Sequence, residues 1–180
     1  MTKFFMQHIG EALSKRDFPR SLGQRPDHFE QFSFRDLQDM ADGPLGFTSI
    51  LLEALSSGGP YQIWGLPAGA EPYTKQMFPG DWLMLLGSEK TCEYIGRIAA
   101  KVPRFAPEVS IALWREPKFP TIVMLEDSRF IDLEWWAFLK KVGYSSHYRL
   151  QGNTSRISES KLRDLEFLDA NQLADWVMEH

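Results

Sequence analysis

Two tryptophans near the ends of apolar segments are the residues in this sequence best suited to hold a ligand. Trp64 lies in YQIWGL (61–66) and Trp114 in VSIALW (109–114), and both segments have the pattern of short strands followed by loops. Flat indole rings hold nucleobases by stacking, which contributes about 1–3 kcal/mol per base. The sequence therefore predicts an aromatic pocket, at two strand ends, that receives a nucleobase.

Two further apolar residues, Leu66 and Phe119, follow the tryptophans closely and are predicted to close the sides of this pocket. Such an enclosure favours a methylated base, because burial of one methyl group contributes on the order of 0.8 kcal/mol. The alternative is that Trp64 and Trp114 are both core residues. Periodicity alone does not distinguish a core tryptophan from one that binds a ligand.

Basic side chains near the predicted strand ends are candidates for contacts with phosphate, although each is also consistent with ordinary surface charge. These candidates are Lys75, Arg97, Arg115, Lys118 and Arg149. The net charge of -4 gives the chain little general attraction for nucleic acid. However, residues 60–156 carry 12 basic and 10 acidic side chains and hold 15 of the 24 aromatic residues. A site for an aromatic or anionic ligand is therefore expected in this middle part.

Motifs for catalysis are not found in the sequence. It contains no GxxxxGK[ST] or GxGxxG phosphate loop, no GxSxG elbow and no zinc-deaminase signature. Asp81 with Glu116-Pro117-Lys118 formally matches a metal-dependent nuclease, but the proline would break the strand that presents the triplet. Cys92 has no histidine nearby in sequence. We expect a protein that is not an enzyme and needs neither a metal nor a cofactor.

The composition indicates a folded, water-soluble chain. It has 180 residues, 43% of them hydrophobic and 24% charged, and its longest apolar runs are far too short to span a bilayer. No secretory signal is visible at the N-terminus. We expect a cytoplasmic protein without a membrane partner.

The order of the expected elements indicates an α+β protein with three parts. Helices are expected from Phe4 to about residue 17 and over 33–43, 48–55, 70–77, 134–142 and 159–179. Strands are expected over 61–66, 82–86, 94–102, 109–114, 121–125 and 148–151, with a hairpin turn at 87–92. We predict a helical extension (1–59), a small, twisted, partly closed barrel of about five strands (60–157) and an acidic C-terminal helix (158–180).

The central segments also resemble a known superfamily. YQIWGLP (61–67), PGDWLMLL (79–86) and YIGRIAAKV (94–102) resemble the EVE and YTH-like branch of PUA-like domains. ALW (112–114), FPTIVML (119–125), Gly143-Tyr144 and LQG (150–152) most resemble the N-terminal recognition domains of McrB-type modification-dependent restriction proteins.

This resemblance implies a non-catalytic reader that flips a modified, methylated base in DNA into an aromatic cage. Trp64 matches the strand tryptophan of the cage in YTH-like domains, and Trp114 matches a tryptophan on a later strand. Such a reader targets a restriction effector, so an effector nuclease or NTPase subunit is a possible partner. Two alternatives remain: an RNA-binding PUA-like module, and a protein-interaction domain without a nucleic-acid ligand.

Overall fold

The structure is a computed structural model that describes residues 1–24, 28–87, 91–150, 152–165, 167 and 169–180. It is an α+β structure with a six-stranded mixed sheet in the order β4-β7-β6-β5-β1-β8 and a separate ribbon of β2 and β3. The strands are β1 (Phe4–His8), β2 (Gly23–Gln24), β3 (His28–Phe29), β4 (Gln62–Leu66), β5 (Trp82–Leu86), β6 (Thr91–Lys101), β7 (Thr121–Glu134) and β8 (Thr154–Arg156). The large sheet is not closed, since β4 and β8 are its two ends, and the predicted barrel is therefore not confirmed.

The helices lie between these strands along the sequence and after the last of them. They are α1 (Gly10–Ser21), α2 (Phe34–Asp39), α3 (Ser49–Ser57), the short 3-10 turn η1 (Ala68–Ala70), α4 (Glu71–Thr74), α5 (Pro107–Trp114), α6 (Trp135–Lys141), α7 (Glu159–Asp164) and α8 (Ala170–Glu179). Two predicted helix starts are confirmed by their caps. Ser33 caps α2 in a reciprocal capping box with Asp36, and the Thr48 side chain accepts the Leu51 N–H at the start of α3.

The first element corrects the prediction that the chain begins with a helix. Residues Phe4–His8 form β1, which pairs in parallel with β5, with Phe4 opposite Trp82 and His8 opposite Leu86. Residues 4–7 are all buried. A strand that is covered on both faces reads as an uninterrupted apolar run, and such a run does not show the alternation that distinguishes a strand from a helix.

A second correction concerns Trp114, which ends a helix and not a strand. Residues 109–114 belong to α5, which has Pro107 in its first turn and ends at Arg115 in the left-handed conformation, with φ 66°. The apolar run in this segment is too short to indicate a period, whereas the preceding proline favours a helix start.

The C-terminal third also differs from the prediction. Residues 148–150 are not a strand, and Gln151 lies outside the described residues; the last strand is β8 at Thr154–Arg156. The predicted helix over 159–179 is two helices, α7 and α8. The helix α6 is confirmed, with Gly143 after it at φ 63°.

The predicted hairpin is confirmed by its strands. β5 and β6 are antiparallel, with Trp82 opposite Arg97 and Leu85 opposite Tyr94, while residues 88–90 of the turn lie outside the described residues. β4 and β7 are also antiparallel, with Trp64 opposite Val123 and Leu66 opposite Thr121.

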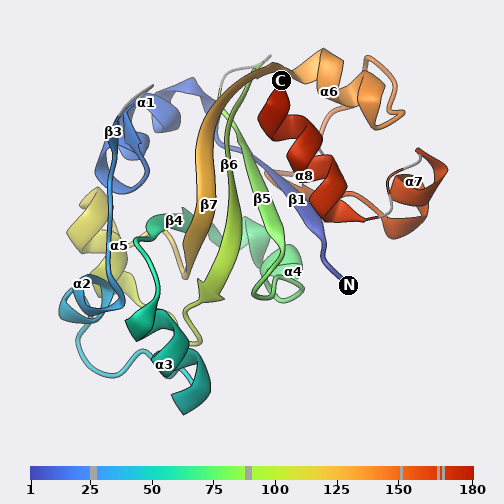
Figure 1. Cartoon of the computed structure of the whole chain (residues 1–180). Coiled ribbons are helices and arrows are strands. Elements are labelled where there is room, and N and C mark those ends of the chain that lie inside the picture. The colour runs from blue at the N-terminus through green and yellow to red at the C-terminus, as the bar shows by residue number, and fades with distance from the viewer. Residues whose placement is uncertain (25–27, 88–90, 151, 166, 168) are drawn as a thin grey trace. The chain divides into compact units, whose positions relative to one another are not determined.

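The chain divides into two compact units of interleaved segments. The first unit contains residues 1–14, 80–97 and 127–180, and the second contains residues 15–79 and 98–126. The predicted division into residues 1–59, 60–157 and 158–180 stays a prediction. In the first unit α8 lies against β1 and β5 (Figure 1), where the indole N–H of Trp82 donates to Asn171 Oδ1 at 2.9 Å. The second unit holds both predicted pocket tryptophans.

Candidate functional site

The four residues predicted to form the aromatic pocket lie together in the second unit. Trp64 and Leu66 come from β4, Trp114 is the last residue of α5, and Phe119 lies in the loop that leads into β7. Ring centroids are 6.1 Å apart for Trp64 and Trp114, 4.8 Å for Trp114 and Phe119, and 6.3 Å for Trp64 and Phe119. We call Trp64, Leu66, Trp114 and Phe119 the aromatic cluster.

The aromatic cluster is closed in this structure. The exposed fractions are 1% for Trp64, 0% for Leu66, 1% for Trp114 and 4% for Phe119. Phe18 of α1 packs edge-on against Trp64, with its ring centroid at 5.5 Å. Since the rings occupy one another's faces, a base could stack on them only after they moved apart. The binding of a base by the aromatic cluster therefore stays a prediction.

Close backbone packing holds Phe119 against β4. A Cβ atom on Gly65 would lie 2.5 Å from the Phe119 ring, so this position accepts only glycine without a shift of the ring. The buried Ser110 hydroxyl donates to the Glu116 carbonyl and accepts the Phe119 N–H at 3.3 Å. The loop between α5 and β7 is therefore held by two interactions: the packing of Phe119 on Gly65 and the hydrogen bonds of Ser110.

One polar atom within the aromatic cluster lacks a partner. The indole Nε1 of Trp114 is buried and makes no hydrogen bond with any atom that the structure describes. A buried donor without an acceptor costs about 1–3 kcal/mol. The backbone carbonyl of the same residue is satisfied, because it accepts a hydrogen bond of 3.1 Å from Arg20.

Charged side chains adjoin the aromatic cluster. Asp17 is fully buried and accepts two hydrogen bonds from Arg16, at 2.7 and 2.9 Å. Lys118 lies 3.8 Å from Asp17, and its Nζ stands 4.9 Å from the centre of the Phe119 ring. Arg16 and Lys118 also share Glu116, which contacts Arg16 at 3.0 Å and Lys118 at 3.1 Å.

These contacts shift the pKa values of Glu116 and Arg16. The hydrogen bond from Lys118 lowers the pKa of Glu116, and the hydrogen bond to Asp17 raises the pKa of Arg16. Sequence reasoning missed Arg16, Asp17 and Arg20. They belong to α1, about a hundred residues before α5, and no local sequence pattern predicts that these two segments are in contact.

The predicted phosphate-binding residues are distributed over both units. In the second unit, Arg115 and Lys118 lie in the loop of the aromatic cluster, while Lys75 pairs with Glu71 at 2.8 Å. In the first unit, Arg97 pairs with Asp127. Arg149, also in the first unit, lines a pocket of about 710 Å³ together with Trp135 and His147.

Asp81 and Cys92, which were considered for catalysis, are both buried. Asp81 accepts the backbone N–H of Lys3 at 2.8 Å. Cys92 is buried, and burial raises the pKa of its thiol. Within the described part of the chain, no three His, Cys, Asp or Glu side chains are grouped to hold a metal ion. The described helices include none with the length and hydropathy needed to cross a bilayer.

Comparison with known proteins gives a match in structure only. No protein-family model matches the sequence, and no curated protein matches it by sequence. The fold is similar to that of the N-terminal domain of Thermococcus gammatolerans McrB bound to m5C DNA, with a TM-score of 0.62 and 12% sequence identity. The similarity covers 98% of this chain and 99% of that domain. It shows a McrB-like fold, and the resemblance to EVE and YTH-like domains stays a prediction.

Proposed function

We propose that this chain binds DNA that carries a methylated base and receives that base in the aromatic cluster. The observation that carries the proposal is the similarity, over nearly the whole of both chains, to a McrB domain bound to m5C DNA. The convergence of Trp64, Trp114 and Phe119 from three separate segments supports the aromatic cluster as the place of binding.

The energetics require the rings to separate around the base. Extruding a base from a duplex costs a few kcal/mol of lost stacking. Two indole faces return about 2–6 kcal/mol at 1–3 kcal/mol each, and enclosure of a methyl group adds about 0.8 kcal/mol. Selectivity for the methylated base is therefore modest, and it depends on both rings.

The unpaired indole N–H of Trp114 gives the base a specific contact. Nucleobases carry ring-nitrogen and carbonyl acceptors on their edges, and a base between the rings would supply the acceptor that Trp114 Nε1 lacks in the free protein. The penalty of about 1–3 kcal/mol for a buried donor would then be relieved on binding.

Basic side chains around the aromatic cluster are suited to hold the flanking phosphates. Arg115 is exposed and has no carboxylate partner in the described structure. Arg16 and Lys118 share Glu116 and Asp17, and they would exchange part of this pairing for phosphate. Because the net charge is -4, local cations and not a general field must provide the attraction.

We propose further that the chain is a recognition module without catalysis of its own, which directs a separate effector nuclease or NTPase to the modified site. A cytoplasmic location fits this role. RNA binding and protein binding without nucleic acid are the alternatives.

The test is a binding titration of the full chain against matched duplexes that contain 5-methylcytosine, N6-methyladenine or no modification. We expect one methylated duplex to bind about fourfold more tightly than the unmodified one, which is the factor that corresponds to about 0.8 kcal/mol. Equal affinity for all three duplexes would contradict the proposal. Tighter binding to the RNA form of the same sequence would favour the RNA-binding module, because only RNA offers the 2′-OH.

A further inference from the structure

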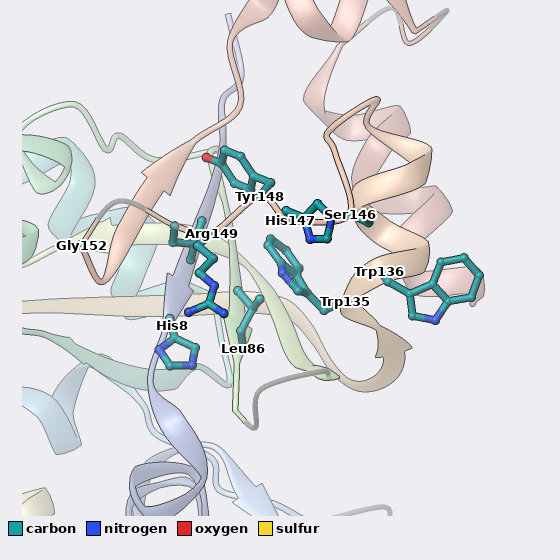
Figure 2. Close-up of a pocket in the computed structure, with 10 residues that line it drawn as sticks. His8, Leu86, Trp135, Trp136, Ser146, His147, Tyr148, Arg149 and Gly152 are labelled. Atoms are coloured by element: carbon teal, nitrogen blue, oxygen red, sulfur yellow. The ribbon is translucent and has the colours of Figure 1, made fainter.

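The first unit contains an open pocket that the proposed function does not use. Residues from several elements line this pocket (Figure 2). They include His8 at the end of β1, Leu86 at the end of β5, Trp135 at the start of α6, and His147 and Arg149 in the loop before β8. Its volume of about 710 Å³ is within the range of about 300–1,000 Å³ typical of small-molecule sites.

Among the aromatic side chains that line this pocket, the half-buried indole of Trp135 offers a flat surface for stacking. The Trp135 ring lies stacked on Phe138, with centroids 5.5 Å apart and an angle of 15° between the ring planes. In Figure 2 this ring lies near Leu86 and His147, whereas the neighbouring Trp136 ring points away. Trp136 donates its indole N–H to Glu134. Trp135 therefore offers a supported flat surface for an aromatic ligand.

The polar wall of the pocket is cationic. The Arg149 guanidinium points toward the His8 ring (Figure 2), and Arg149 has no carboxylate partner among the described residues. None of the described side chains that line the pocket is acidic. A guanidinium with free donors binds phosphate through two parallel hydrogen bonds.

The loop that carries Arg149 is held in place before any ligand binds. The Tyr144 and Tyr148 rings are stacked with centroids 4.1 Å apart, and Lys161 Nζ lies 4.2 Å from the centre of the Tyr144 ring. Lys161 also donates to the Gly143 carbonyl at 3.1 Å. Preorganisation of this kind lowers the entropy cost of binding.

We propose that this pocket binds one nucleotide, with its base stacked on Trp135 and its phosphate held by Arg149 beside His8. The ligand is a nucleoside monophosphate, which is available either as the free compound or as one residue of a DNA strand. The inference rests on the first unit alone and does not require the aromatic cluster of the second unit.

The test is a calorimetric titration of the full chain with dCMP and dAMP, with deoxycytidine and inorganic phosphate as partial ligands. We expect the nucleotides to bind at least about tenfold more tightly than either part, because both walls of the pocket then contribute. Arg149→Gln should weaken nucleotide binding at least about tenfold. Arg163→Gln, an exposed arginine of α7 in the same unit, is the matched control and should leave it unchanged.

A second titration with a short single-stranded oligonucleotide identifies the source of the nucleotide. Competition between the oligonucleotide and dCMP, with the same loss in Arg149→Gln, indicates a residue of a DNA strand; binding of dCMP alone indicates the free compound. Absence of binding by both, or equal binding by the Arg149→Gln and parent proteins, would overturn the inference. The preference for a methylated duplex is measured separately, so either proposal can fail alone.

Discussion

Replacement of Trp114 by phenylalanine separates a ligand-binding role of this residue from a packing role. The substitution keeps an aromatic ring against Phe119 and Trp64 but removes the indole N–H, which has no partner among the described atoms. In the free protein, the loss of an unsatisfied donor offsets part of the lost packing. We therefore expect the free energy of unfolding to change by less than about 2 kcal/mol.

Binding should respond more strongly than stability. If the N–H donates to the flipped base, its removal leaves a buried acceptor unpaired, which costs about 1–3 kcal/mol. This corresponds to a loss of affinity for the methylated duplex of about 5- to 150-fold. The assay is fluorescence anisotropy with a labelled duplex, and the free energy of unfolding is measured in parallel by urea denaturation.

The control is Trp176→Phe, since Trp176 lies on α8 in the first unit and stacks on His180, with ring centroids 4.6 Å apart. We expect this variant to bind methylated DNA as the parent does. If Trp114→Phe also binds as the parent does while remaining folded, the indole N–H does not contact the base and our reasoning about the aromatic cluster is refuted. Alanine variants would not give this answer, because truncating a tryptophan that is 1% exposed costs about 3–5 kcal/mol of stability.

Three further predictions concern the fold. Gly65→Ala should lower the melting temperature by several degrees in thermal unfolding, because its Cβ would lie 2.5 Å from the Phe119 ring; an unchanged value would mean that the ring shifts freely. Cys92 should resist thiol reagents at neutral pH until the protein is unfolded, because burial raises its pKa, and rapid labelling of the native protein would contradict this. The pKa of Tyr144 is raised to about 12 by burial, so the stability that this group contributes is complete below an unfolded pKa of about 10 and is lost as the pH rises through 12. Spectroscopic titration of the tyrosines checks this, and a Tyr144→Phe variant that keeps the full alkaline absorbance change near pH 10 supports it.

The fold was predictable where the sequence carries local signals. Ser33 and Thr48 cap helix starts, and Gly143 adopts the left-handed conformation that follows a helix end. Each residue type favours its position by local interactions, and these boundaries are confirmed. β1 was not predictable in the same way. Its partners β5 and β8 lie far along the chain, and residues 4–7 are buried, so no alternation marks it as a strand. The α1 residues that adjoin the aromatic cluster were missed for a related reason, because their contacts exist only after distant segments meet.

The convergence of the aromatic cluster was predictable even though its secondary structure was partly misassigned. Trp114 is the last residue of its element whether that element is a strand or a helix, and in both cases it directly precedes the same loop. That loop ends at Thr121, which pairs with Leu66 in the β4–β7 ladder. Phe119 therefore must lie beside the end of β4, and the absence of a side chain at Gly65 lets its ring pack against the strand. What the sequence could not indicate is whether the rings enclose an open space, because that depends on their rotamers and on Phe18, which packs against them from α1. Because Trp64 and Trp114 are buried, the base recognition that we propose requires the two rings to move apart.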